Sequence, residues 1–277
     1  MWTQNMIETP RGNFEYFQMG SGKPICITHQ YTEFNSKGNI FAAPFTKYYT
    51  VYLINLRGCG NSIDSTSPDD FSFMNSVKDL EAIRIALGFS QWSFAGHSAG
   101  GMLGLTYAIT NPNSLQKIIV GGLSASSKYM SHPDSIYCKS NPYNSRLLEI
   151  LKLLKDPSKT LEQRRALNKE WNLMSFYKKE DYDRIMSRPN SGKAVNKRLD
   201  YFITTELKDY DVTDRLKAIN IPAFIYCGRF DTQCPLVFSE EIARAINHSS
   251  LTIFEKSSHN PFVEEEEAFH HFVKSTK

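Results

Sequence analysis

The segment Gly96-His97-Ser98-Ala99-Gly100 has the spacing G-x-S-x-G, which can present a serine hydroxyl as a nucleophile. In this pattern the serine lies on a strained turn between a strand and a helix, called a nucleophile elbow. The glycines two residues before and after the serine allow neighbouring backbone to approach without a Cβ clash. A glycine- and serine-rich loop that begins a helix can have the same composition, so the short match needs support from the rest of the chain.

Asp231 and His259 supply the other two residue types that an activated serine requires. A serine hydroxyl is a poor nucleophile at neutral pH and needs a base within hydrogen-bond reach. Imidazole has a suitable pKa, and a carboxylate fixes its tautomer and stabilises the imidazolium. The chain order Ser, Asp, His is the order expected with this elbow. We therefore predict a catalytic triad in which Ser98 is the nucleophile, His259 is the base and Asp231 orients His259.

Alternating strands and helices must position these three residues. We predict an N-terminal hairpin within residues 4–19, buried strands over residues 24–28, 49–54, 92–95, 117–122, 221–227 and 250–254, and helices over residues 35–45, 73–87, 99–109, 236–246 and 261–273. The alternation predicts an α/β fold with a doubly wound, mostly parallel β-sheet. Loops at the carboxyl ends of such strands line one crevice, and Ser98, Asp231 and His259 each follow a different strand.

Residues 124–210 differ in character from the rest of the chain. Short apolar runs are absent there, and amphipathic helical stretches occur at residues 146–154, 161–174, 181–186 and 193–207. About ninety residues without a strand exceed one crossover connection. We therefore predict a helical insertion over residues 124–210, with the α/β core over residues 1–123 and 211–277. The alternative is that these helices simply cover the sheet.

Composition and charge limit the classes of partner. The chain has 277 residues with 41% hydrophobic and 22% charged residues, typical of a globular protein, and its net charge of +3 includes no basic block that would indicate nucleic acid. The five cysteines show no metal-ligand spacing, and their odd number favours reduced thiols, so we predict no metal and a cytoplasmic location. The N-terminus lacks signal-peptide features, and no apolar run is long enough to cross a membrane. We expect a small-molecule substrate, no membrane or nucleic-acid partner and no cofactor; the oligomeric state is not predicted.

Four segments of the chain resemble the signature segments of the α/β-hydrolase superfamily: residues 57–62, 96–100, 228–235 and 258–264. The resemblance covers nearly the whole chain except the insertion. It implies that the insertion is a helical cap that shapes the substrate pocket. The turn Arg57-Gly58-Cys59-Gly60 is also similar to that of the proline iminopeptidase branch, although many members of the superfamily share R-G-x-G.

The chain departs from the superfamily pattern after its third strand. Members commonly have His-Gly-x-Pro there, whereas this chain has His29-Gln30-Tyr31-Thr32. Position by position, the resemblance implies that the backbone N–H groups of Tyr31 and Ala99 form the oxyanion hole. Because glutamine replaces the glycine, the sequence does not define the backbone conformation of residues 29–32. We interpret His29 as a residue that positions its loop through hydrogen bonds, because the triad already supplies a base.

The elbow also departs from the proline iminopeptidase pattern. Those enzymes usually carry Gly-Gly-Ser-Trp-Gly, whereas His97 and Ala99 flank the serine here. We expect His97 to pack beside the elbow. This departure argues against aminopeptidase activity, which would also need acidic groups facing the pocket to bind a substrate amine. Acidic candidates within the insertion are Glu149, Glu162, Glu170 and Glu206.

The expected function is that of a serine hydrolase that cleaves a small-molecule ester, amide or related acyl bond through an acyl-enzyme intermediate. Serine at the elbow, in place of aspartate, argues against epoxide or haloalkane chemistry. Several alternatives stay open. They are a proline iminopeptidase-like aminopeptidase, a C–C bond hydrolase or acyltransferase that uses the same triad, and a non-catalytic ligand receptor on the same fold.

Overall fold

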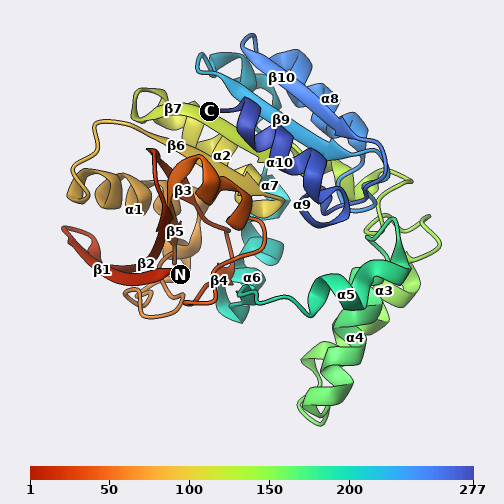
Figure 1. Ribbon diagram of the computed structural model, residues 1–277. Helices are drawn as coiled ribbons and strands as arrows, with labels where there is room; N and C mark the ends of the chain where they lie inside the picture. The colour runs from red at the N-terminus through yellow and green to blue at the C-terminus, as the bar shows by residue number, and fades with distance from the viewer.

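An eight-stranded sheet forms the centre of the computed structural model, which describes all residues 1–277 (Figure 1). Its strands are β1 (Thr3–Thr9), β2 (Gly12–Gly20), β3 (Lys23–Ile27), β5 (Tyr49–Ile54), β6 (Trp92–His97), β7 (Leu115–Gly121), β9 (Ala223–Gly228) and β10 (Ser249–Phe254). Their spatial order is β1-β2-β5-β3-β6-β7-β9-β10. The β1–β2 and β2–β5 pairs are antiparallel, and every pair from β5 to β10 is parallel. The predicted mostly parallel sheet is confirmed.

Helices cover both faces of the sheet. The helices of the α/β core are α1 (Phe73–Ala86), α2 (Ala99–Thr110), α8 (Leu236–Ala245), α9 (Pro261–Glu264) and α10 (Glu266–Ser275), with short 3₁₀ helices at Ala43–Lys47, Pro68–Phe71, Pro112–Ser114 and Thr213–Ala218. Alternate residues of a strand point to opposite faces. Accordingly, Cys26 packs in the core beneath α1, α2 and α8, whereas Ile25 and Ile27 pack in the second core beneath α10. The predicted doubly wound arrangement is confirmed.

Residues 124–210 contribute no strand to the main sheet. Their helices are α3 (Asn144–Lys155), α4 (Leu161–Leu173), α5 (Tyr182–Met186), α6 (Asn196–Tyr201), a π-helix (Phe202–Glu206) and α7 (Leu207–Asp209), with 3₁₀ helices at Ser127–Ser131 and Lys179–Asp181. Helices α3 and α4 lie side by side and extend away from the sheet (Figure 1). They bury a small cluster of their own around Leu147 and Ile150. A two-residue strand, β8 (Lys193–Ala194), pairs with β4 (Thr32–Glu33).

The predicted helix over residues 35–45 is wrong. Turns and irregular backbone occupy residues 35–42, and the only helix in this segment is the 3₁₀ helix Ala43–Lys47. Gly38 has a positive φ of 72°, which interrupts a right-handed helix. The side-chain oxygen of Asn39 accepts hydrogen bonds from the N–H groups of Phe41 and Ala42. An asparagine that bonds nearby backbone in this way favours a turn over a continuous helix.

Two other predicted helices are interrupted. The segment 193–207 begins as strand β8 and becomes helical only at Asn196. The predicted helix over residues 261–273 is broken into α9 and α10 at Glu265, whose φ of −128° and ψ of 58° are not helical. The Glu265 carboxylate accepts hydrogen bonds from the Lys256 N–H and the Ser257 hydroxyl. These bonds to the preceding loop fix Glu265 outside the helix.

Candidate active site

Ser98 occupies a strained turn between β6 and α2. With φ 55° and ψ −125°, it is the only residue other than glycine that has a positive φ. Its N–H donates to the carbonyl of Gly121 on β7 at 2.9 Å, which fixes the turn against the sheet. A Cβ atom at Gly96 would lie 2.3 Å from the Gly100 carbonyl oxygen, and one at Gly100 would lie 2.6 Å from that of Thr28. Only glycine fits these two positions, so the turn is held by direct backbone packing.

Asp231 and His259 form a buried pair on the loops that follow β9 and β10. The His259 Nδ1 atom lies 2.9 Å from Asp231 Oδ2, and the two residues are 5% and 4% exposed. Asp231 Oδ1 also accepts hydrogen bonds from the N–H groups of Gln233 and Cys234 at 2.8 and 2.9 Å. A carboxylate only accepts hydrogen bonds, so Nδ1 of His259 carries the proton and Nε2 is free to accept one.

Ser98 and His259 line the same pocket, so three loops distant in sequence meet at one edge of the sheet. The structure records no hydrogen bond between the Ser98 hydroxyl and the ring of His259. Catalytic hydrogen bonds of this kind often reach their full strength only in the complex with substrate. The arrangement therefore contains a strained serine, an imidazole that can accept a proton and a carboxylate that fixes the imidazole.

His97 packs against the ring of His259, with 4.6 Å between the ring centroids. Its Nδ1 atom lies 3.0 Å from the hydroxyl of Tyr226, and its Nε2 atom is buried without a hydrogen-bond partner. Burial lowers the pKa of His97 well below its usual value, and the nearby His259 lowers it further. His97 is therefore a neutral ring beside the elbow at physiological pH.

The loop after β3 faces the elbow. His29 Nδ1 lies 2.8 Å from the hydroxyl of Thr32, and burial lowers the pKa of His29 to about 3. The N–H of Tyr31 donates to the same Nδ1 atom over a donor–acceptor distance of 3.5 Å, which makes this hydrogen bond long and weak. Ala99 is the first residue of α2, where an N–H has no intrahelical partner. Tyr31, Ala99 and Ser98 line one pocket together.

Arg198 is a residue of α6 that sequence analysis missed. It is fully buried, and its guanidinium donates to the carbonyl oxygens of Gln30 and Arg57 and to the Ser76 hydroxyl. The guanidinium also lies over the Phe71 ring, 5.3 Å from its centroid. Burial lowers the pKa of Arg198 to about 10, so it stays charged at neutral pH. No sequence pattern distinguishes it from the neighbouring exposed basic residues.

Glu264 is a second missed residue, and it fixes the loop that carries His259. Its carboxylate accepts hydrogen bonds from the N–H groups of Ser258, Asn260 and Tyr177. Burial raises the pKa of Glu264, and the three backbone donors oppose that rise. In the sequence, the acidic run 264–267 indicates only a favourable interaction with the dipole of a helix that begins there. In the structure, Glu264 holds the backbone on both sides of His259.

Comparisons with known proteins agree with the fold. The family model described as the alpha/beta hydrolase fold matches residues 23–266. The chain belongs to the α/β-hydrolase fold family. A solved structure of an alpha/beta fold family hydrolase from Bacillus anthracis str. Sterne is 55% identical, covers 100% of both chains and superposes with a TM-score of 0.98.

Relatives of this α/β-hydrolase family chain support a hydrolytic function. The proline iminopeptidase of Heyndrickxia coagulans is 25% identical over 97% of this chain and 96% of its own. The pimeloyl-[acyl-carrier protein] methyl ester esterase of Aliivibrio salmonicida is 22% identical over 90% of each chain.

None of the helices in the structure combines the length and the hydropathy that spanning a membrane requires.

Two pockets of this α/β-hydrolase chain meet at Ser98. The first has a volume of about 330 Å³, contains His259 and has many amide side chains, namely Asn39, Asn172, Asn190, Gln233 and Asn260. The second has a volume of about 240 Å³ and lies beneath the helices of residues 124–210, where 15 of its 18 lining residues are hydrophobic. Tyr31, Ser98 and Gln233 line both pockets. We call them the amide pocket and the apolar pocket.

Neither pocket has a charged wall. No Asp, Glu, Lys or Arg lines the amide pocket or the apolar pocket. Glu149 and Glu170 pair with Arg146, and Glu162 is exposed on α4. Glu206 accepts a hydrogen bond from the Phe73 N–H at 3.1 Å. The acidic candidates for binding a substrate amine therefore lie outside both pockets.

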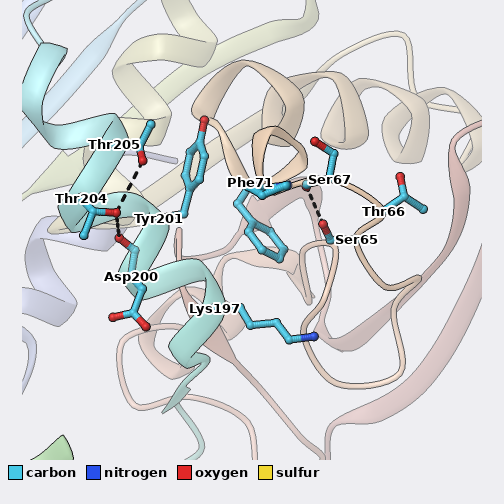
Figure 2. A pocket seen from close by; sticks show the side chains of 10 residues that line it. Ser65, Thr66, Ser67, Phe71, Lys197, Asp200, Tyr201, Thr204 and Thr205 are labelled. Atoms are coloured by element: carbon cyan, nitrogen blue, oxygen red, sulfur yellow. Dashed lines mark hydrogen bonds between the residues drawn. The ribbon is translucent and has the colours of Figure 1, made fainter.

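A larger open hollow of about 470 Å³ lies between residues 65–71 and helix α6 with the following π-helix (Figure 2). Ser65 Oγ donates to the Ser67 carbonyl and Thr204 Oγ1 donates to the Asp200 carbonyl, both within their own segments (Figure 2). The Tyr201 hydroxyl joins the two segments by donating to Asp69 at 3.2 Å. Neither Ser98 nor His259 lines this hollow. It therefore has no part in the candidate active site, despite its size.

Proposed function

We propose that this chain is a serine hydrolase that cleaves an uncharged carboxylic ester through an acyl-enzyme intermediate. The observation that carries the proposal is the buried Asp231–His259 pair on the same pocket as Ser98, whose backbone is held in a strained conformation. Strain at a single polar residue beside a proton acceptor is typical of a reactive site. We further propose that residues 124–210 act as the cap, since their helices line the apolar pocket.

In the proposed mechanism, Ser98 Oγ attacks the ester carbonyl carbon while Nε2 of His259 accepts the hydroxyl proton. The N–H groups of Tyr31 and Ala99 donate to the carbonyl oxygen as it becomes negatively charged. Asp231 stabilises the imidazolium through Nδ1. When the tetrahedral intermediate collapses, the ester C–O bond breaks and His259 gives its proton to the leaving alcohol. Water then attacks the acyl-enzyme with His259 as base, which releases the acid and restores Ser98.

The pocket walls favour an ester over a peptide with a free amino terminus. An aminopeptidase must bind a substrate ammonium group, and burial of that charge without a carboxylate is costly. The absence of acidic side chains from both pockets therefore argues against the activity that the name of its proline iminopeptidase relatives describes.

Labelling with a fluorophosphonate probe tests the proposed nucleophile. The wild-type protein should be labelled at neutral pH, whereas Ser98→Ala should lose labelling and reduce kcat for p-nitrophenyl butanoate by about 10⁴-fold or more. Ser93→Ala is the matched control, because Ser93 lies on β6, the strand that leads to Ser98, is fully buried and lines neither pocket. It should be labelled like the wild type.

Two outcomes would contradict the proposal. A folded wild-type protein that resists the probe would exclude an activated Ser98 and favour a ligand receptor. Cleavage of aminoacyl naphthylamides without cleavage of any p-nitrophenyl ester would favour an aminopeptidase instead.

A further inference from the structure

The two pockets at Ser98 differ in chemistry, and their relation to His259 differs as well. His259 lines the amide pocket and is absent from the wall of the apolar pocket. Ala99, whose N–H is free at the start of α2, lines the apolar pocket and is absent from the wall of the amide pocket. The proton acceptor and the start of α2 thus lie toward opposite sides of the same serine.

This asymmetry fixes the direction in which an ester can bind, if the proposed function holds. The leaving oxygen must receive its proton from His259 when the C–O bond breaks. The alcohol part of the substrate must therefore occupy the pocket that His259 lines, which is the amide pocket. The acyl part remains attached to Ser98 and must extend the other way, into the apolar pocket.

We propose that the substrate class is an ester of an uncharged, medium-length apolar acyl group with a small, neutral, polar alcohol. Leu147, Leu151 and Leu199 lie among the hydrophobic residues around the acyl group. On the alcohol side, the Gln233 side-chain oxygen accepts from Tyr137 OH, which leaves its NH₂ group free for a ligand. The amide side chains of Asn190 and Asn260 also line this pocket.

Esters of increasing acyl length test the acyl side of this assignment. The value of kcat/KM for p-nitrophenyl esters should rise at least tenfold from acetyl to hexanoyl, because each buried methylene contributes up to about fourfold. It should fall again at palmitoyl, because the apolar pocket holds only about 240 Å³. On the alcohol side, glyceryl hexanoate should be cleaved faster than ethyl hexanoate.

Three tryptophan substitutions test which pocket holds which part. Leu199→Trp narrows the apolar pocket and should lower the hexanoyl-to-acetyl ratio of kcat/KM about tenfold or more. Met186→Trp narrows the amide pocket and should reduce the glyceryl-to-ethyl preference while it leaves the acyl-length optimum in place. Leu161→Trp is the matched control, because Leu161 is exposed on α4 and lines neither pocket.

The outcomes distinguish this inference from the proposed function. If the probe labels Ser98 but activity is highest for acetyl esters, or if the effects of Leu199→Trp and Met186→Trp are exchanged, the substrate assignment is wrong and the serine hydrolase stands. If the probe does not label Ser98, the proposed serine hydrolase itself fails.

A separate observation concerns the peptide group between Gln30 and Tyr31. Its carbonyl accepts a hydrogen bond from the buried Arg198 guanidinium, and its N–H belongs to Tyr31. The C=O and N–H of a planar trans peptide point in opposite directions. A charged donor on the carbonyl therefore fixes the N–H direction and strengthens that N–H as a donor. The Gln30 side chain adds a second anchor by donating to the Phe71 carbonyl at 2.6 Å.

We infer that Arg198 is a positioning residue that aims the Tyr31 N–H at the developing oxyanion. This inference rests on the proposed role of Tyr31. It explains how the loop keeps a defined backbone although Gln30 stands where related chains have glycine. It also couples helix α6 to the chemistry of Ser98, because Arg198 is the α6 residue that reaches this peptide group.

Arg198→Met and Arg198→Lys test the inference. Both should lower kcat about 10²-fold per labelled site with KM changed less than threefold, because the lost effect acts on the transition state. A trifluoromethyl ketone, which forms a tetrahedral adduct with the serine, should bind more weakly by a similar factor. Counting probe-labelled sites corrects for any misfolded protein.

Arg84→Met is the matched control. Arg84 is also buried and donates to two backbone carbonyls, those of Phe89 and Ser90, but it lies on α1 outside both pockets. It should lower the melting temperature without lowering kcat per labelled site. If both arginine positions give the same kcat per labelled site as the wild type, Arg198 has only a structural role and the inference is wrong.

Discussion

The two walls of the candidate active site, the elbow and the loop after β3, are fixed in opposite ways. The elbow at Ser98 is held by backbone packing among residues 96–100, Thr28 after β3 and Gly121 on β7. The loop at His29 and Gln30 is held by side chains distant in sequence, above all Arg198, which lies 168 residues further along the chain. Local packing thus sets the nucleophile, whereas a long-range contact sets the opposite wall.

The difference predicts where each wall is vulnerable. Substitutions within the elbow should act through backbone strain. Only small side chains there should leave the rest of the fold intact. The loop after β3 should respond to changes in residues 190–198, where Ser191 and Asn190 also bond to the segment 35–40. Three predictions test this contrast, in addition to the experiments above.

The largest expected effect is that of Gly96→Ala. Its Cβ would lie 2.3 Å from the Gly100 carbonyl oxygen, which is backbone and cannot turn away. The free energy of unfolding should fall by about 3 kcal/mol or more, measured by urea denaturation. Gly88→Ala is the control: Gly88 lies in a turn, with φ 77°, and a Cβ there meets nothing within 4 Å. It should cost only about 1 kcal/mol. Equal losses would show that the elbow is not held by close packing.

The next effect, counted per pH unit, is a loss of stability in acid that involves one histidine from each wall. Burial lowers the pKa of His29 to about 3 and that of His97 well below its usual 6.5. Below pH 6.5 the unfolded chain binds protons at these sites and the folded chain does not. Stability should therefore fall as the pH decreases from about 6.5 toward 3, by up to about 1.4 kcal/mol per pH unit for each ring.

Urea denaturation between pH 7.5 and 4.5 measures this slope. His29→Asn and His97→Asn should each make the dependence shallower, and the double variant should be the shallowest. His271→Asn is the control, because His271 is exposed on α10. If neither substitution changes the dependence of unfolding free energy on pH, these two rings bind protons in the folded protein as they do in the unfolded chain.

The smallest effect is a gain in stability from Ser98→Gly. Glycine relieves the strain of a positive φ, which costs a serine about 1–3 kcal/mol, but it adds flexibility to the unfolded chain. The net gain should be about 1 kcal/mol in urea denaturation, together with loss of probe labelling. A loss of stability would indicate that the strain is absent or that the Ser98 side chain stabilises the fold.

Much of the fold could be predicted from the sequence because its strands are short apolar runs between turns. Residues 24–28 and 49–54 became β3 and β5 almost as predicted. Two of the errors occurred where a side chain bonds to backbone in place of a helix. Asn39 stops the predicted helix over residues 35–45, and Glu265 divides the last helix by bonding to the preceding loop. Composition and periodicity do not report such bonds.

The sequence by itself determined the candidate nucleophile and its turn, because the glycines that the elbow requires lie within five residues of one another. It also identified Asp231 and His259 as partners through their order after successive strands. Only the tertiary structure decided that Arg198 anchors the loop after β3, that Glu264 holds the His259 loop, and that the pockets on either side of Ser98 differ in polarity. The physical reason is that these features depend on side-chain directions in the helices of residues 124–210 and on contacts between segments far apart in the chain, which local spacing does not encode.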